Sequence, residues 1–289
     1  MNCELCPRKC GIDRDKQVGF CGVTNTVKIA RAGLHFWEEP IISGKEGSGT
    51  IFFSGCNLKC VYCQNYDISS EAFGKEITVE RLAEIFKELE EKGANNINLV
   101  TPSHYVNQII EAVKIYKPKI PIVYNTSGYD SVETIKKLKG VVDIYLTDLK
   151  YCSAEYSKKY SKAEDYFLVA TQAIKEMIKQ QPENCFKNDI MVKGVVIRHM
   201  VLPGLIEDSF NVLNWIKENL GEDVIVSVMG QYTPYHNSKN YPEINRKLKP
   251  LEYKMVLNHF IKIGLKNGFS QELDSASEEY IPPFNLEGV

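Results

Sequence analysis

The sequence predicts an α/β protein built as an open, partial (β/α)6 barrel with a cysteine-rich N-terminal extension. Six short runs rich in β-branched and aromatic residues alternate with longer segments that have the period of an amphipathic helix. Such alternation is typical of parallel βαβ units. Six units are two short of the eight that close a full barrel, so we expect the barrel to be open.

The expected strands are mostly continuous apolar runs, as strands covered on both faces should be. They span Thr50–Ser54, Asn96–Val100, Ile120–Asn125, Val142–Thr147, Met191–Val201 and Val224–Met229. Three of the intervening helices have recognisable boundaries. They start at Thr78, at Asp208 or Ser209, and at Pro250, and they end before Gly93, Gly221 and Gly268.

Composition limits the classes of partner. The 289 residues carry 35 basic and 37 acidic side chains, for a formal net charge of -2. This balance gives no electrostatic reason to expect nucleic acid or an anionic membrane as partner. The sequence has no run of about 18 or more apolar residues that would predict a transmembrane helix. The first residues lack the basic and apolar regions of a signal peptide, so we expect a cytoplasmic location.

Cysteine usage is the most informative part of the composition. Seven of the nine cysteines lie in the first 63 residues. An odd count in a long chain does not suit a secreted disulfide framework, and clustered thiols in a reducing compartment indicate metal ligands instead. We therefore expect a metal-binding N-terminal segment over residues 1–46 and a partial barrel over residues 47–289.

Cys56, Cys60 and Cys63 have the spacing C-x3-C-x2-C and follow the first expected strand. Active sites of barrels lie at the carboxyl ends of the strands, which is where this loop falls. A cubane 4Fe–4S cluster normally takes four thiolates, so three would leave one iron open to another ligand. A zinc knuckle or three unrelated thiols are the alternatives, and the position after a strand favours the cluster.

This spacing, with Tyr62 before the third cysteine, resembles the radical S-adenosylmethionine (SAM) superfamily. A closer resemblance, to the pyruvate formate-lyase-activating-enzyme-like family, covers nearly the whole chain. It is carried by Leu34–Pro40, Gly47–Phe53, Cys63–Ser69, Asn98–Tyr105, Tyr124–Tyr129 and Val201–Gly204. The resemblance implies that SAM chelates the open iron and is cleaved reductively to a 5′-deoxyadenosyl radical. It also implies that the radical takes hydrogen from a backbone glycine of a partner glycyl-radical enzyme.

The resemblance implies several SAM contacts. Tyr62 would pack against the adenine. Thr101 and Ser103 occupy the place where relatives carry a Gly-Gly-Glu motif that grips the SAM amino group. This sequence lacks that motif, and an ordinary strand-end loop explains these residues equally well. Asp148 and Lys150 resemble the Asp-x-Lys of the activases near the SAM carboxylate, with an ion pair without a functional role as the alternative.

Arg198 matches the activase arginine that clamps the SAM carboxylate. Bidentate recognition of a carboxylate suits a guanidinium, and an arginine in so apolar a run needs a partner. A structural Arg–Asp pair is the alternative. Asn125 and Ser127, at the end of the third strand, and Gln231, after the sixth, are further candidates for binding SAM.

Cys3, Cys6, Cys10 and Cys21 form a second group, with the spacing C-x2-C-x3-C-x10-C. A closed tetrahedral zinc site and an auxiliary 4Fe–4S cluster fit this spacing equally well. Redox-active or unoccupied thiols are the remaining alternative. A metal here would stabilise a segment too polar to form a core of its own.

The leading hypothesis is an enzyme that cleaves SAM at a 4Fe–4S cluster and abstracts hydrogen from a protein or peptide, with a flavodoxin- or ferredoxin-type reductant. One alternative is radical modification of another peptide or of a small molecule. Another is a non-enzymatic iron–sulfur electron-transfer protein. A tRNA substrate is disfavoured because no basic cluster follows a phosphate backbone.

Overall fold

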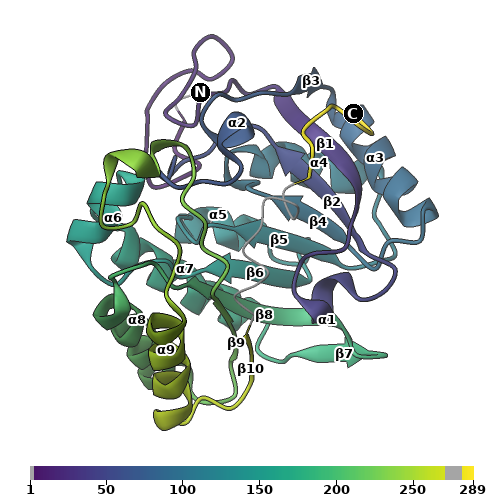
Figure 1. Ribbon diagram of the computed structural model, residues 1–289. Helices are drawn as coiled ribbons and strands as arrows, with labels where there is room; N and C mark the ends of the chain where they lie inside the picture. The colour runs from purple at the N-terminus through teal and green to yellow at the C-terminus, as the bar shows by residue number, and fades with distance from the viewer. Residues whose placement is uncertain (1–2, 271–281) are drawn as a thin grey trace.

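The computed structural model describes residues 3–270 and 282–289 of the chain, and its strands form one large mixed sheet. The strand order in the sheet is β10-β9-β8-β6-β5-β4-β2-β1-β3. The six expected strands are confirmed as parallel neighbours in its centre. They are β2 (Ser48–Phe53), β4 (Ile97–Val100), β5 (Ile122–Thr126), β6 (Ile144–Asp148), β8 (Ile190–Met200) and β9 (Ile225–Met229). Because β3 (Lys75–Ile77) and β10 (Gly268–Ser270) end the order without pairing to each other, the barrel is open (Figure 1).

Helices cover the outer face of the sheet (Figure 1). The longer ones are α3 (Val79–Glu91), α4 (Val106–Ile115), α5 (Val132–Lys137), α6 (Ala154–Ser161), α7 (Tyr166–Gln180), α8 (Ile206–Leu220) and α9 (Pro250–Lys262). Thr78 caps α3 as expected, since its side chain accepts a hydrogen bond from the Arg81 N–H at 3.1 Å. Helix α8 begins at Ile206, slightly before the expected start, and α9 ends at Lys262, before the expected end.

The inner face of the sheet has an apolar floor. Alternate residues of β6 point to opposite faces, so Tyr145 packs under the helices while Ile144 and Leu146 point inward. The short helix α1 (Pro40–Ser43) places Ile42 among these inward residues. This packing fills the amino end of the barrel.

Strand β1 (Val27–His35) was not predicted from the sequence. It pairs antiparallel with β2 and, at its start, with β3. The C-terminal residues also join it, because Leu286 N–H donates to Ala30 and Ala32 N–H donates to Glu287. Strand β7 (Cys185–Lys187), antiparallel to β8, was missed as well. The division at residue 46 stays a prediction.

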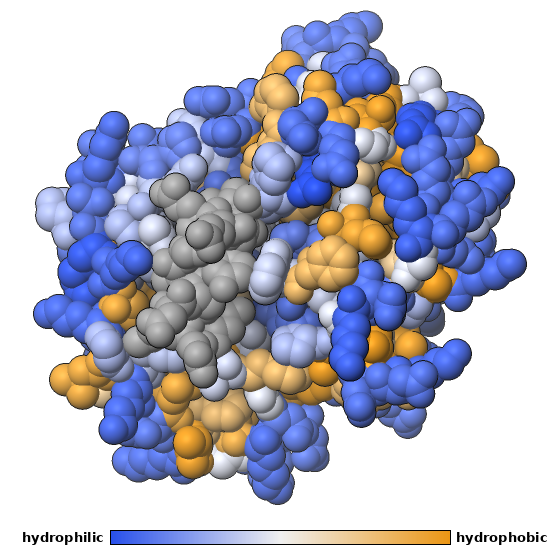
Figure 2. All heavy atoms as spheres, turned by 45° about the vertical axis from the view of Figure 1, so that its right-hand side comes forward, coloured by the Kyte–Doolittle hydropathy of each residue, from blue (hydrophilic) through white to orange (hydrophobic). Residues whose placement is uncertain are grey.

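Three short helices stand in loops at the carboxyl end of the barrel or close to it: α2 (Tyr66–Ser69), η1 (Ser103–Tyr105) and η2 (His236–Asn240). None of the helices in residues 3–270 and 282–289 has both the length and the apolar character that spanning a bilayer requires. Figure 2 shows one face of the molecule, on which hydrophilic residues dominate the outline and hydrophobic residues gather in patches nearer the middle. Apolar patches of this kind are ordinary on a globular protein.

Candidate active site

The C-x3-C-x2-C loop leaves the carboxyl end of β2 and lies over the polar half of the barrel. Two of its three cysteines are buried and the third is half-buried. Each sulfur accepts one hydrogen bond: Cys56 from the Leu58 N–H at 3.4 Å, Cys60 from the Ser161 hydroxyl at 2.9 Å, and Cys63 from the Ser69 hydroxyl at 3.3 Å. Donors of this kind stabilise thiolates that bind a metal cluster.

The loop suits a cluster better than a single ion. Among the described residues no three Cys, His, Asp or Glu side chains converge on a position for one metal ion, and this holds for both cysteine groups. Thiolates of a cubane bind different irons and need not meet at one point. Burial, together with thiolate charge on Cys56 and Cys63, raises the pKa of Cys60 to about 12, although Lys150 opposes the shift. Holding all three cysteines as thiolates therefore requires a positive centre between them.

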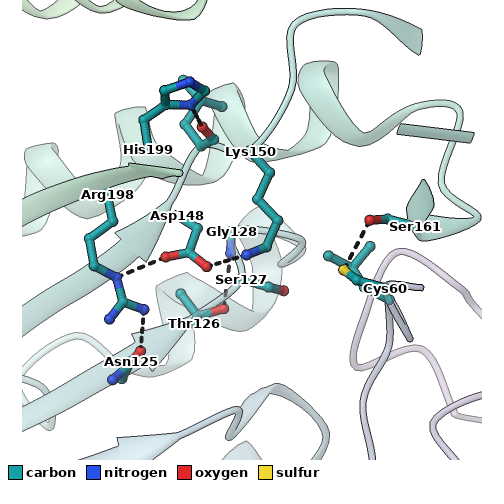
Figure 3. A network of polar contacts seen from close by, with 12 residues as sticks. Cys60, Asn125, Thr126, Ser127, Gly128, Asp148, Lys150, Ser161, Arg198 and His199 are labelled. Atoms are coloured by element: carbon teal, nitrogen blue, oxygen red, sulfur yellow. Dashed lines mark hydrogen bonds and ion pairs between the residues drawn. The ribbon is translucent and has the colours of Figure 1, made fainter. Parts of the chain in front are cut away.

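Opposite the loop, Asp148 joins two cations. Its Oδ1 accepts from Arg198 Nε at 2.8 Å, and its Oδ2 accepts from Lys150 Nζ at 2.5 Å (Figure 3). Register sets this contact, because Asp148 of β6 pairs with Arg198 of β8. Burial raises the pKa of Asp148, but the two cations outweigh burial and hold that pKa below its usual value. Asp148 is thus an ionised carboxylate facing the cluster loop.

The guanidinium of Arg198 donates hydrogen bonds to acceptors within the protein. Beyond Asp148, it donates from one Nη to Asn125 Oδ1 at 2.7 Å and from the other to Glu38 Oε2 at 3.2 Å. Glu39 Oε2 lies 3.9 Å from the same guanidinium. This agrees with the structural Arg–Asp pair, although Arg198 also lines the space beside the three-cysteine loop. In Figure 3 the Lys150 ammonium is directed at Asp148, on the side of that carboxylate nearer to Cys60.

Glu38 and Glu39 were not identified as site residues from the sequence. They lie in the connection from β1 to α1 and enter the barrel beside Arg198. Burial raises the pKa of both, that of Glu39 to about 6, although Arg198 opposes the shift. Glu39 Oε2 has no hydrogen-bond partner among the described residues. The available signal was an acidic pair directly before a proline in an otherwise apolar stretch.

Two adjoining cavities separate the loop from this network. A cavity of about 150 Å³ is lined by the three cysteines together with Thr101, Asn125, Ser127, Asp148, Lys150 and Arg198. A second, of about 220 Å³, shares two of the cysteines and the three charged residues, and adds Tyr62 and Gln231. The Tyr62 ring meets Tyr232 edge-on at 5.6 Å, and its hydroxyl is hydrogen-bonded to that of Tyr151. The fold therefore brings most of the expected SAM contacts to one place.

Ser103 lies apart from these cavities. It is buried in η1, and its side chain is hydrogen-bonded to Asp130, in a separate network. Thr101 does line the smaller cavity and has a left-handed backbone with a φ of 58°. Such a φ is strained for a β-branched residue and easy for glycine.

The four N-terminal cysteines also lie close together. Cys6 and Cys21 are buried, and Cys3 and Cys10 are half-buried. Burial, together with negative charge on the other three cysteines, raises the pKa of Cys6 to about 12. All four are free thiols close enough to act on the charge of Cys6, although no three of these described residues converge on a position for a single ion.

The chain is similar to proteins of a known superfamily. Residues 50–216, more than half of it, match the family described as the Radical SAM superfamily. The chain belongs to this superfamily. Membership implies an enzyme with a 4Fe–4S cluster and SAM, and it disfavours a protein that only transfers electrons.

Two relatives extend the comparison. The uncharacterized protein MJ0674 of Methanocaldococcus jannaschii is 34% identical over 276 residues, which cover 91% of this chain and 75% of that protein. The pyruvate formate-lyase-activating enzyme of Clostridium pasteurianum is 26% identical over 228 residues, or 73% of this chain and 87% of the relative. The radical SAM assignment is therefore secure at the level of the superfamily.

Solved structures share the fold. Streptococcus suis SuiB, crystallised with the precursor peptide SuiA, aligns with a TM-score of 0.50 at 15% identity over 76% of this chain and 48% of SuiB. The FeFe-hydrogenase maturase HydG of Carboxydothermus hydrogenoformans aligns with a TM-score of 0.50 at 15% identity over 80% of this chain and 56% of HydG. The chain thus spans about half the length of these structures, and the likeness extends to the fold alone.

Proposed function

We propose that this radical SAM enzyme abstracts a hydrogen atom from the backbone of a protein partner, with a glycyl-radical enzyme as the leading candidate. The observation that carries the proposal is the cavity shared by the three-cysteine loop and the Asp148–Lys150–Arg198 network. In that cavity, thiols that can hold a cluster face charged side chains that can bind the amino and carboxylate groups of SAM.

Each group has a distinct part in this proposal. Cys56, Cys60 and Cys63 hold the cluster, and Lys150 binds the SAM carboxylate while Arg198 orients Asp148. Thr101, Asn125, Ser127, Tyr62 and Gln231 supply the polar and aromatic walls. When bound, the cluster and SAM supply the electron and the bond cleavage that generate the 5′-deoxyadenosyl radical. The walls restrict where that radical can move and exclude water from it.

Two features favour a macromolecular substrate. The barrel is open between β3 and β10, which leaves a lateral edge for an extended chain. The relative from Clostridium pasteurianum is named for activating pyruvate formate-lyase, and SuiB was crystallised with a peptide. We also propose a flavodoxin- or ferredoxin-type protein as the source of the electron.

A second candidate is radical modification of a different peptide or of a small molecule. The Thr101–Ser103 segment in place of Gly-Gly-Glu and the extra cysteine group favour it, because both depart from the activase pattern.

The experiment is isotopic. The reconstituted enzyme, SAM and reduced flavodoxin are incubated with a purified glycyl-radical enzyme that contains α-deuterated glycine. We expect a glycyl-radical signal by electron paramagnetic resonance (EPR) and deuterium in 5′-deoxyadenosine. The matched control replaces Cys56, Cys60 and Cys63 with alanine and should yield neither. Unlabelled 5′-deoxyadenosine without a glycyl signal would contradict glycine as the source and favour the second candidate.

A further inference from the structure

The N-terminal cysteine group lies directly against the three-cysteine loop. The Cys56 N–H donates to the carbonyl of Cys21 at 3.0 Å, so one cysteine of each group shares a hydrogen bond. Gly55 makes this approach possible. Its φ is 88°, and a Cβ at this position would lie 2.8 Å from the same Cys21 oxygen. Only glycine tolerates both conditions.

Arg8 makes a second connection between the groups. Its Nε donates to the Asn57 carbonyl at 2.8 Å, within the loop, and an Nη donates to the Ser161 carbonyl at 3.3 Å. The Ser161 hydroxyl in turn donates to the sulfur of Cys60. The guanidinium lies 4.0 Å above the Phe20 ring, which keeps it in place. The N-terminal segment therefore supports the loop at two of its three cysteines.

The backbone gathers the four N-terminal thiols. Hydrogen bonds fold the segment back, from Cys3 N to Ile12 O at 2.8 Å, from Gly11 N to Cys3 O at 3.1 Å, and from Lys9 N to Cys6 O at 3.0 Å. A Cβ on Gly19 would lie 3.5 Å from the Cys21 sulfur and 3.8 Å from the Cys10 sulfur. Four thiolates are the donor set of a closed zinc site or of a 4Fe–4S cluster, and the lack of a convergence point for one ion among the described residues favours the cluster.

We propose that Cys3, Cys6, Cys10 and Cys21 bind a thiolate-ligated metal centre whose occupancy holds the three-cysteine loop in the shape that binds its own cluster. In short polar segments the free energy of metal binding is free energy of folding. A centre bound to Cys21 would order its carbonyl, and with it the Cys56 N–H. This proposal rests on the proposed role of the loop as the radical SAM cluster site.

Metal analysis tests the site itself. In the variant with Cys56, Cys60 and Cys63 changed to alanine, we expect one zinc, or about four irons with sulfide, to remain per chain after anaerobic reconstitution. The element found distinguishes zinc from an iron–sulfur cluster. Absence of bound metal would overturn the site. This result does not depend on SAM cleavage, so it separates failure of the site from failure of the proposed function.

Amide hydrogen exchange and EPR test the coupling. In Cys3→Ser/Cys10→Ser we expect loss of the N-terminal metal, faster exchange over residues 55–63 and loss of the SAM-induced change in the EPR spectrum of the reduced loop cluster. Arg8→Met should keep the metal but also speed this exchange. Cys185→Ser, at a half-buried cysteine outside both groups, is the matched control and should change nothing. Metal retained in Cys3→Ser/Cys10→Ser, or lost with exchange and spectrum unchanged, would contradict the proposal.

Discussion

At the scale of single residues, the site depends on how Arg198 is shared among acidic groups. The guanidinium contacts Asp148, Glu38 and Asn125 at once, at distances from 2.7 to 3.2 Å. Asp148 in turn holds Lys150, so the orientation of the lysine depends on Arg198 through this carboxylate. In the proposed function, Arg198 is therefore a positioning residue, and Lys150 is the cation that binds the SAM carboxylate.

Changing Arg198 to lysine tests this arrangement. A lysine cannot reach the three acceptors in the geometry of the planar fork, and hydrogen bonds to charged groups contribute about 1.5–3 kcal/mol each. We therefore expect the SAM dissociation constant of the anaerobic protein to rise about tenfold or more. Arg81→Lys, in a half-exposed ion pair on α3 far from the site, is the control. Equal affinity in Arg198→Lys and wild type would show that the network does not position Lys150.

Glu39 makes stability depend on pH. Because burial raises its pKa from 4.5 to about 6, the folded chain holds this proton more tightly than the unfolded chain. The stabilisation is complete below pH 4.5 and is lost as the pH rises through 6. Glutamine mimics the protonated acid. Relative to Glu39→Gln, the free energy of unfolding of wild type should fall by up to about 2 kcal/mol between acidic and neutral pH. If denaturant titrations give the same difference in unfolding free energy between wild type and Glu39→Gln at every pH, the result would contradict this.

At the scale of elements, the strands that can be predicted from the sequence are those with continuous runs of apolar residues. The central strands are predictable because they are covered on both faces and their neighbours are helices with distinct caps. Strands β3, β7 and β10 are short and partly exposed, so they carry too few apolar residues to be recognised. In β1, partly exposed residues interrupt the buried ones, and its pairing depends on β2 and β3.

Site residues also divide into those that local sequence predicts and those that depend on tertiary structure. The cysteine loop is predictable because spacing and position after a strand are both local. Glu38 and Glu39 are not, because their entry into the barrel depends on the path from β1 to α1, which no periodicity encodes. Ser103 is displaced from the cavity because η1 turns its side chain towards Asp130. Tertiary geometry decides which polar residues of a strand-end loop face inward.

The cap of α3 provides a test at this scale. Thr78→Ala removes the acceptor of the Arg81 N–H and should lower the free energy of unfolding by about 1 kcal/mol. Thr78→Ser keeps an acceptor oxygen and should lose much less. Equal losses in the two variants, measured by denaturant unfolding, would show that the hydroxyl is not the stabilising group.

At the scale of the whole molecule, two cysteine groups meet at the carboxyl end of one open barrel. The cluster loop and the carboxyl ends of β4, β5, β6 and β8 enclose a small polar cavity, while the opposite end is filled by α1 and an apolar floor. The sheet edges at β3 and β10 stay apart. In the proposed function, the cavity is the place of radical chemistry, and the side where these edges do not pair is the approach for a partner.

The most direct test of the account is anaerobic SAM cleavage. The protein is reconstituted with iron and sulfide, then given dithionite and SAM, and 5′-deoxyadenosine is quantified against the variant with Cys56, Cys60 and Cys63 all changed to alanine. The account predicts product from wild type and none from the variant. No product from wild-type protein that carries a full cluster would contradict it.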